Sequence, residues 1–335
     1  MGEKGLASQV PQPAESAPIM AVMDSTPYNT YARQIVAKLL SADILGLFPE
    51  CQRWLDEHAV DLDDWQIALP LISCLAAGGW LEDGMEIAAA WYSMYLASSI
   101  LDHVEDGEFL PDVLVRSPAE AVNLGTGLIF LSYRCLSSIK ALGGVVRSSA
   151  IFSDQGFGAA SGQQHSLAMT GLKSPLPVNA ALEQYWQTII LKSGSVFRAG
   201  TAGGAAAATQ DEVIIEALGK YGTALGVMLQ LLDDGRDLLK TSDEVIQAWE
   251  ISLPLLLYLL ATDQENVVFP AIHTRAEWHR CLREARVFET FSDILLQWKK
   301  LAVESIQSLG STEEKKMLEK FPELILEPIK PEGYK

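Results

Sequence analysis

Apolar residues recur at every third or fourth position along most of this chain, which is the spacing of amphipathic helices. Glycine and proline residues interrupt the pattern and separate its runs. The periodic runs predict helices over residues 30–48, 63–77, 85–106, 118–142, 147–169, 177–208, 218–239, 241–261 and 275–309. No segment shows the alternation of apolar and polar residues that is typical of a half-buried strand. The pattern therefore predicts an all-α fold with a single helical domain.

The two ends of the chain depart from this pattern. Residues 1–25 are rich in Gly, Ser, Pro and Ala and predict a disordered tail, and the proline-containing residues 321–335 predict a surface tail. The helical domain is therefore expected over residues 26–320. Inside it, the Gly and Ala stretch at 200–208 resembles a linker in composition. It is poor in Ser and charge, so tight packing of a helix is the favoured interpretation.

Composition narrows the possible functions. The chain has 335 residues, 49% of them hydrophobic, which is enough for one large core. Its net charge of -18 disfavours nucleic acid and anionic membranes as partners. The apolar runs are too interrupted for a transmembrane helix and the start lacks a signal-peptide core, so a cytoplasmic protein is expected. Four widely spaced cysteines without a C-x-x-C pair disfavour zinc and disulfides and predict buried thiols.

The candidate chemistry begins with the stretch QLLDDGRD, residues 230–237, inside a predicted helix. Gln230, Asp233, Asp234 and Asp237 stand at positions i, i+3, i+4 and i+7, which brings most of them onto one face. Clustered carboxylates suit a hard cation such as Mg²⁺. The alternative is a solvated acidic face, since 43 acidic residues stand against 25 basic ones. The apolar surroundings favour the metal.

A second acidic stretch ends the predicted helix at 85–106. This helix is apolar on nearly all sides until it reaches LDHVED, in which Asp102 and Asp106 lie one turn apart. Two such helices would hold metal ions from opposite walls of one cavity. Few carboxylates are available, so water and substrate oxygens would complete the coordination, as is usual for Mg²⁺ bound to phosphates.

These stretches resemble the motifs of trans-isoprenyl diphosphate synthases, the polyprenyl synthetase family. QLLDDGRD keeps every specified position of their second motif, Q-x-x-D-D-x-x-D, and LDHVED is similar to their first, D-D-x-x-D, with His103 replacing the second aspartate. YWQTIILKSGSVFRAG resembles the helix with their diphosphate-binding lysine, here Lys192. ASGQQHSLAM, with Gly162 and Gln163, and SLPLLLYLLA resemble two further family segments. The order agrees across about residues 30–300.

The resemblance implies a class I isoprenoid synthase bundle around a deep central cavity, working as a homodimer on an allylic prenyl diphosphate with three Mg²⁺ ions. The implied metal ligands are Asp102, Asp106, Asp233, Asp234 and Asp237, and the implied catalytic residues are Asp102, Asp106, Asp233, Lys192 and Gln230. Substrate contacts are implied for Lys192 and Gln163. Arg236 and Arg198 would either reach the leaving group or pair with neighbouring acids. Without the resemblance, Lys192 would be read as a solvated lysine.

The residues before Asp102 bear on the length of the prenyl chain. In the family, bulk at the fourth and fifth positions before the first aspartate limits chain length, and here these are the small Ser98 and Ala97. A deep pocket for a farnesyl, geranylgeranyl or longer chain is expected, with Met94 and Trp91 nearer its floor. The alternative is that both are ordinary core residues. His103 is either catalytic or a hydrogen-bonded histidine in a tolerated position.

The departures from the family concern the second substrate. Chain-elongating members bind isopentenyl diphosphate through a basic segment before the first motif and an Arg-Arg pair after it. This chain has no Lys or Arg between Trp54 and Leu101, and after Asp106 the first basic residue is Arg116. Diphosphate recognition rests on such cations. The first expectation is therefore a terpene synthase that cyclises or quenches the cation of one allylic diphosphate. The alternative is a prenyltransferase, either a chain elongator or an enzyme with a non-isoprenoid acceptor, and a non-catalytic partner subunit ranks last.

Overall fold

The structure, a computed structural model, describes residues 27–58, 64–107, 114–170, 176–239, 246 and 251–327. The tail expected at 1–25 lies outside the described residues. The described elements are α1 (Pro27–Leu40), η1 (Asp43–Leu47), α2 (Pro49–His58), α3 (Asp64–Ala76), α4 (Leu81–Glu105), α5 (Pro118–Leu136), α6 (Leu142–Thr170), α7 (Val178–Ile189), η2 (Ile190–Gly194), α8 (Ser195–Ala208), α9 (Glu212–Leu239), α10 (Leu253–Ala261), α11 (Arg275–Glu284), α12 (Val287–Ser305) and α13 (Glu313–Leu326). In these ranges the only β pairing is one isolated bridge, between Pro177 and Asn266, so the all-α prediction is confirmed.

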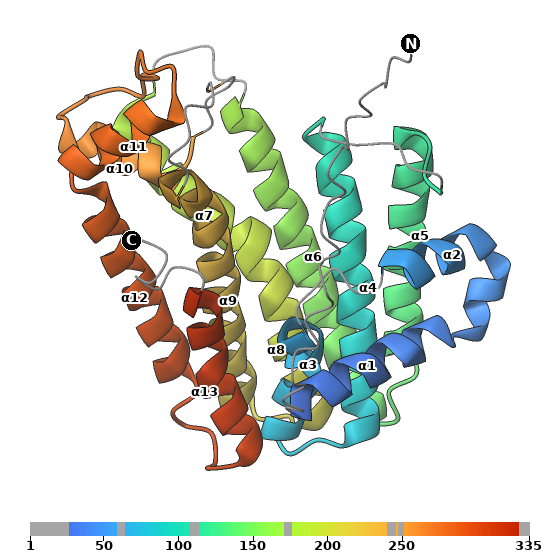
Figure 1. The fold of residues 1–335 in the computed structure, drawn as a ribbon. Helices are drawn as coiled ribbons and strands as arrows, with labels where there is room; N and C mark the ends of the chain where they lie inside the picture. The colour runs from blue at the N-terminus through green and yellow to red at the C-terminus, as the bar shows by residue number, and fades with distance from the viewer. Residues whose placement is uncertain are drawn as a thin grey trace, which may run out of the picture.

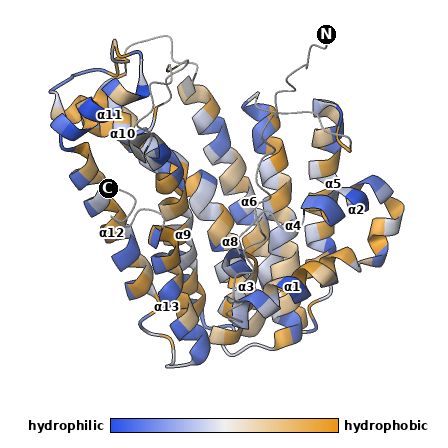
Figure 2. Ribbon diagram, viewed as in Figure 1, coloured by the Kyte–Doolittle hydropathy of each residue, from blue (hydrophilic) through white to orange (hydrophobic). Residues whose placement is uncertain are grey.

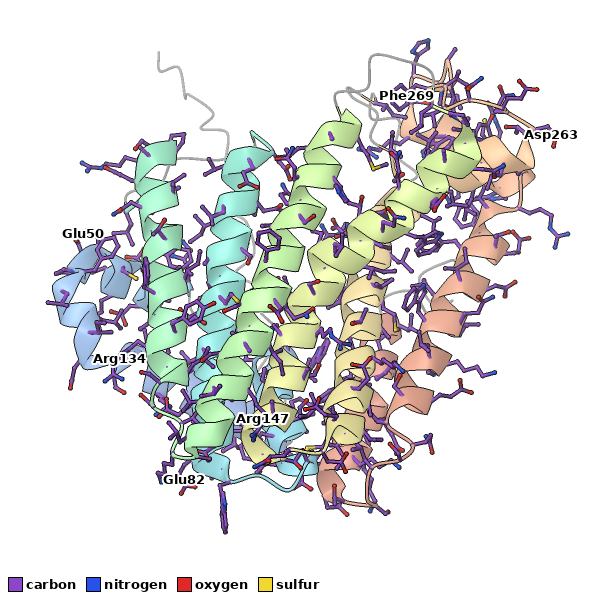
Figure 3. The ribbon with its side chains drawn as sticks, turned by 180° about the vertical axis from the view of Figure 1, so that it is seen from behind. Glu50, Glu82, Arg134, Arg147, Asp263 and Phe269 are labelled. Carbon is purple, nitrogen blue, oxygen red and sulfur yellow. The ribbon has the colours of Figure 1, made fainter. Side chains whose placement is uncertain are left out.

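The long helices lie side by side in a bundle (Figure 1). Helix α8 packs against α3, α6 and α9, and α4 packs along α5. In the view from behind, Glu82 at the start of α4 and Arg147 near the start of α6 lie at one end of the bundle, and Asp263 and Phe269 lie at the other (Figure 3). Helix α9 also runs toward that second end, where α10 and α11 gather (Figure 1). The acidic ends of α4 and α9 are thus carried to the same end of the molecule.

Burial follows from the apolar pattern of each helix. Hydrophobic and hydrophilic residues alternate around outer helices such as α12 and α13 (Figure 2). Helix α4 instead buries residues on all sides, since Ile87 through Met94 are all buried. Helix α8 buries its whole small-residue stretch from Ala199 to Ala207, so the interpretation as tight packing rather than a linker is confirmed. Small side chains let α8 lie close to its neighbours at the centre of the bundle.

Several helix boundaries differ from the prediction. The run at 30–48 divides into α1 and the 3-10 segment η1, and α2 follows where no helix was expected. The run at 275–309 is broken at Arg286, whose φ of 58° is left-handed. Helix α13 extends past the expected domain boundary at residue 320 and buries Phe321 and Ile325. Residues 241–245 and 247–250 of the run at 241–261 lie outside the described part of the chain, as do residues 328–335.

Two general features follow from the described residues. All four cysteines are free. Cys51, Cys74 and Cys135 are buried, as predicted, whereas Cys281 is only half-buried. Burial raises the pKa of the Cys51 thiol to about 11. In the described part of the chain, no helix combines the length and apolarity that crossing a membrane requires.

Candidate functional site

Lys192 lies on a π-helical segment, η2, which joins α7 to α8 without a break. The sequence predicted one helix over 177–208, and the chain does remain helical there. A π turn inserts an extra residue into the helix and is frequently found at functional sites. It rotates the residues that follow it relative to those before it. The position of Lys192 and Ser193 therefore depends on how this segment is held.

Two glycines allow the neighbouring helices to hold η2 closely. A β-carbon on Gly162 of α6 would overlap the backbone nitrogen of Lys192. A β-carbon on Gly226 of α9 would overlap the carbonyl oxygen of Ser193. Because only glycine fits at these two positions, α6 and α9 reach the η2 backbone from separate directions. The segment is fixed between them.

The acidic end of α4 meets Lys192 directly. The Nζ atom of Lys192 lies 2.8 Å from Oδ1 of Asp102 and 4.0 Å from Oδ2 of Asp106. These side chains are 25%, 34% and 33% exposed, respectively, so the cluster is reachable from solvent but partly shielded. The Nε2 atom of Gln163 donates to Oδ1 of Asp106 at 3.0 Å. Three elements, α4, α6 and η2, thus bring together residues that the sequence assigned to one site.

Gln163, whose amide nitrogen bonds to Asp106, also carries a buried acceptor. The residue is 7% exposed, and its Oε1 atom has no hydrogen-bond partner among the described residues. A buried amide oxygen without a partner costs about 1–3 kcal/mol. A ligand could satisfy it only after the side chain turned, because the oxygen is closed off from solvent.

The acidic end of α9 is organised around Asp234. Tyr185 donates its hydroxyl to Oδ2 of Asp234 at 2.7 Å, and the backbone N–H of Leu253 donates to the same oxygen at 3.0 Å. Gln230 Nε2 donates to Oδ1 at 3.2 Å, and its Oε1 accepts from the hydroxyl of Ser193 at 2.8 Å. Asp234 is therefore linked to the residue next to Lys192 through one intervening side chain.

Burial perturbs the titration of this network. Desolvation raises the pKa of Asp234 to about 6, although the hydrogen bonds from Leu253, Tyr185 and Gln230 oppose it. Burial, followed by the charge of Asp234, raises the pKa of Tyr185 well above its usual value. Tyr185 therefore remains a hydroxyl donor at physiological pH.

Asp233 differs from its sequence neighbour. Its side chain is 56% exposed, and Oδ1 lies 2.8 Å from NH1 of Arg236, one turn along the same helix. Of the two adjacent aspartates, Asp233 is thus the one open to a ligand. Asp237 lies on α9, but its side chain lies outside the described residues.

Arg198 and His103 lie in other surroundings. Arg198 forms an ion pair with Glu216 of α9, which corresponds to the pairing with a neighbouring acid considered from the sequence. The exposed His103 has Nδ1 2.7 Å from the carbonyl oxygen of Ser99, so it is a hydrogen-bonded histidine on its own helix.

The candidate pocket residues lie on α4 before Asp102. Trp91 is fully buried, and its Nε1 donates to the carbonyl oxygen of Val196 at 2.8 Å. Its ring lies 5.4 Å from that of Tyr95. Helical spacing places Trp91, Tyr95 and Ser98 on the face that carries Asp102.

Two of the pocket candidates point elsewhere on α4. Ala97 is fully buried and shares a face with Ser93, whose hydroxyl donates to Leu128 of α5 at 2.8 Å. Ala97 therefore faces α5 rather than the Asp102 face. Met94 is 8% exposed, and its sulfur is directed toward Gly156 of α6. The expectation that these residues set chain length stays a prediction.

Three residues of the site were not singled out from the sequence. Tyr185 and Ser193 flank Lys192 on α7 and η2 and bond to α9. Glu105 lies within the first motif, and burial followed by the charges of Asp102 and Asp106 raises its pKa, against the effects of Gln163 and Lys192. The sequence did offer one indication of these residues, since all three lie inside segments that resemble the family's motifs. Their partners come from distant parts of the chain, which spacing alone does not reveal.

The residues fit a divalent metal that is completed by substrate oxygens, rather than one enclosed by protein. In the described ranges, no group of three or more His, Cys, Asp or Glu side chains is gathered as a metal cage. Mg²⁺ in phosphate sites commonly takes one or two carboxylates and fills its shell with water and phosphate. The ammonium of Lys192 beside Asp102 and Asp106 shows that this acid pair accepts a cation.

A comparison with protein families matches part of the chain. Residues 114–275 match the family model described as "Polyprenyl synthetase". A comparison with curated proteins finds no match.

Solved structures share the fold over nearly their whole length. A geranylgeranyl pyrophosphate synthetase from the archaeon Geoglobus acetivorans superposes with a TM-score of 0.74 at 16% identity, covering 90% of this chain and 100% of that chain. A polyprenyl synthetase from Streptomyces coelicolor gives 0.72 at 19% identity, covering 90% and 99%. A polyprenyl synthase from Caulobacter crescentus, solved with calcium and isoprenyl diphosphate, gives 0.69 at 17% identity, covering 90% and 94%.

Proposed function

The chain belongs to the trans-isoprenyl diphosphate synthase family, the polyprenyl synthetases, and from that premise we propose that it is a metal-dependent prenyltransferase that ionises an allylic prenyl diphosphate. Of the functions considered from the sequence, the comparisons favour prenyl transfer over the terpene synthase that was expected first. The acceptor is proposed to be a molecule without a diphosphate.

The observation that carries this proposal is the contact of Lys192 with Asp102 and Asp106. Ionising an allylic diphosphate leaves a negative pyrophosphate that must be stabilised. Bound Mg²⁺ would supply Lewis-acid stabilisation of that leaving group. Asp102 and Asp106 of α4 and the exposed Asp233 of α9 would hold the metal ions. Lys192 would then leave the acid pair and donate to the diphosphate.

The choice of acceptor rests on missing positive charge. No Lys or Arg occurs between Trp54 and Leu101. Arg116, the first basic residue after Asp106, is ten residues further along the chain and forms an exposed ion pair with Glu120, with NH2 2.7 Å from Oε1. A second diphosphate, as in isopentenyl diphosphate, would lack the cations that phosphate binding needs. An acceptor without a diphosphate meets no such requirement.

A second candidate function is cyclisation or quenching of the cation by water, which is terpene synthase chemistry. The aromatic rings of Trp91 and Tyr95, on the face of α4 that leads to Asp102, favour it. Aromatic faces attract a carbocation, so a prenyl cation would be stabilised within the protein without an external acceptor.

The experiment uses the purified protein with Mg²⁺ and farnesyl or geranylgeranyl diphosphate, supplied alone, with isopentenyl diphosphate, or with a nucleophilic acceptor such as indole. Pyrophosphate release and organic products are measured. A prenylated acceptor supports the proposal, and an alcohol or hydrocarbon from the diphosphate alone supports the second candidate. Product that requires isopentenyl diphosphate establishes chain elongation. No pyrophosphate release in any arm favours the non-catalytic subunit.

The resemblance also supports a homodimer in the cytoplasm as part of this proposal. Light scattering of the purified protein tests the dimer, and fractionation of the source cells tests the location.

A further inference from the structure

Asp234 and Tyr185 lie at the junction of four elements beside the proposed diphosphate lysine. We infer that these two residues are positioning residues that hold the η2 segment, and with it Lys192, in place, and that Asp234 is not itself a metal ligand. The inference rests on the proposed function, in which Lys192 binds the diphosphate. It assigns different tasks to the adjacent acids Asp233 and Asp234.

The carboxylate of Asp234 is already occupied by donors from three directions. Oδ2 accepts from Tyr185 at 2.7 Å and from Leu253 N at 3.0 Å, and Oδ1 accepts from Gln230 at 3.2 Å. Leu253 is the first residue of α10, where the backbone N–H lacks a partner within the helix. A metal bound at this carboxylate would have to displace these donors and leave them unsatisfied in a desolvated region.

The same contacts attach the continuous helix formed by α7 and η2 to α9, at one residue before Lys192 and one after it. Tyr185 lies seven residues before Lys192, which is about two helical turns, and bonds directly to Asp234. Ser193 directly follows Lys192 and bonds to Gln230, which in turn bonds to Asp234. Both attachments end on one carboxylate of α9. Loss of either attachment would free the backbone that presents Lys192 to Asp102.

Asp233 provides the contrast within the same motif. It is 56% exposed, and its described partner, Arg236, is an exposed side chain on the same helix. Exposed partners exchange with water at little cost. Asp233 therefore remains available to a metal, while Asp234 is committed to holding α7, α9 and α10 together.

Tyr185→Phe tests the inference because it removes one hydroxyl and leaves every carboxylate in place. The matched control is Tyr221→Phe, since the hydroxyl of the fully buried Tyr221 donates to the carbonyl oxygen of Leu318 at 2.6 Å, away from Asp234. Three quantities are measured for each variant: hydrogen exchange of the backbone around residues 190–194, the Kd of Mg²⁺ alone, and the Kd of inorganic pyrophosphate in the presence of Mg²⁺.

Tyr185→Phe is expected to speed hydrogen exchange around residues 190–194 by about tenfold and to raise the Kd of pyrophosphate by about tenfold. A change of about tenfold is the effect expected from the loss of one hydrogen bond to a charged group. The Kd of Mg²⁺ alone should equal or fall below the wild-type value, because a loosened Lys192 competes less for Asp102. Tyr221→Phe should leave all three quantities unchanged. Ser193→Ala, a milder change at the other attachment, should act in the same direction and serves if Tyr185→Phe does not fold.

Two results would overturn the inference. One is weaker binding of Mg²⁺ alone in Tyr185→Phe, since that assigns Asp234 to the metal. The other is exchange around residues 190–194 that is the same in Tyr185→Phe, Ser193→Ala and wild type. If the wild type binds no pyrophosphate, the proposed function fails, while the exchange measurement still decides whether Asp234 and Tyr185 position the segment.

Discussion

Replacing Lys192 with methionine should change metal binding and diphosphate binding in opposite directions. The Lys192 ammonium stands 2.8 Å from Asp102 and 4.0 Å from Asp106, so it occupies the place of a cation at this acid pair. Methionine is similar in length but uncharged, and the two carboxylates would lose their counter-ion. The metal would then no longer compete with the ammonium.

The exposure of the cluster sets the size of the effect. Because the three side chains are a quarter to a third exposed, their interaction is screened and falls near the upper end of the range for accessible ion pairs, about 1 kcal/mol. Mg²⁺ alone should therefore bind Lys192→Met up to about fivefold more tightly than the wild type. Pyrophosphate with Mg²⁺ should bind at least tenfold more weakly, since a hydrogen bond to a charged group is worth about 1.5–3 kcal/mol.

Isothermal titration calorimetry measures both quantities, first with the metal alone and then with pyrophosphate at saturating metal. Lys38→Met is the matched control, because Lys38 forms a 2.7 Å ion pair with Glu86 of similar partial burial near the other end of α4. It should change neither affinity. Weaker binding of the metal alone to Lys192→Met would refute the competition, and unchanged pyrophosphate binding would remove Lys192 from the diphosphate site.

Three further predictions concern single residues. Asp233→Ala should lower activity at least a hundredfold and raise the Mg²⁺ concentration needed for half-maximal rate. Asp293→Ala, on the exposed side of α12, should change neither quantity. Both quantities are obtained by measuring the rate at increasing Mg²⁺ concentrations. Gly162→Ala should destabilise the fold by about 1–3 kcal/mol, because its β-carbon would overlap Lys192. Gly46→Ala should have a smaller effect, because its β-carbon would meet no atom within 4 Å. Thermal unfolding measures the stability of both variants. In metal-free protein, Asp234 has a pKa raised from 3.8 to about 6, so the folded state binds this proton more tightly. The protonated Asp234 therefore contributes its full stabilisation below pH 3.8, and this stabilisation is lost as pH rises through about 6. The free energy of unfolding should fall by at most about 3 kcal/mol over this range. Urea unfolding of wild type and Asp234→Asn at pH 5 and pH 7.5 should show the wild type losing stability relative to the variant at the higher pH, and an equal difference at both pH values would contradict the burial of this charge.

Local periodicity predicted the long helices because each keeps an apolar face over many turns. It did not predict the break at Arg286, since arginine carries no turn signal and the left-handed φ is imposed by the chain around it. Pro322 was read as part of a tail, yet it lies buried inside α13. The energy of burying Phe321 and Ile325 outweighs the local cost of that proline.

In the site, too, contacts between residues close in sequence could be predicted and contacts between distant residues could not. Spacing alone placed Asp102 and Asp106 on one face, and the structure keeps that relation. Spacing did not separate Asp233 from Asp234, because the difference depends on Tyr185 and Leu253, which are 49 and 19 residues from Asp234 in sequence. The π turn at Lys192 likewise left no trace in the apolar pattern, since the helix continues on both sides of it.

The position of Lys192 also predicts that metal and diphosphate bind cooperatively. A metal at Asp102 and Asp106 must displace the ammonium, and a displaced ammonium is free to bind the diphosphate. Each ligand thus removes part of the cost of binding the other, and the coupling must be the same in both directions. If the broken ion pair is worth about 1 kcal/mol, saturating pyrophosphate should tighten Mg²⁺ binding by about fivefold beyond their direct contact. This roughly fivefold effect of pyrophosphate on Mg²⁺ binding should be absent in Lys192→Met and present in Lys38→Met. Equal coupling in wild type and Lys192→Met would show that the lysine stays with its carboxylates when the ligands bind.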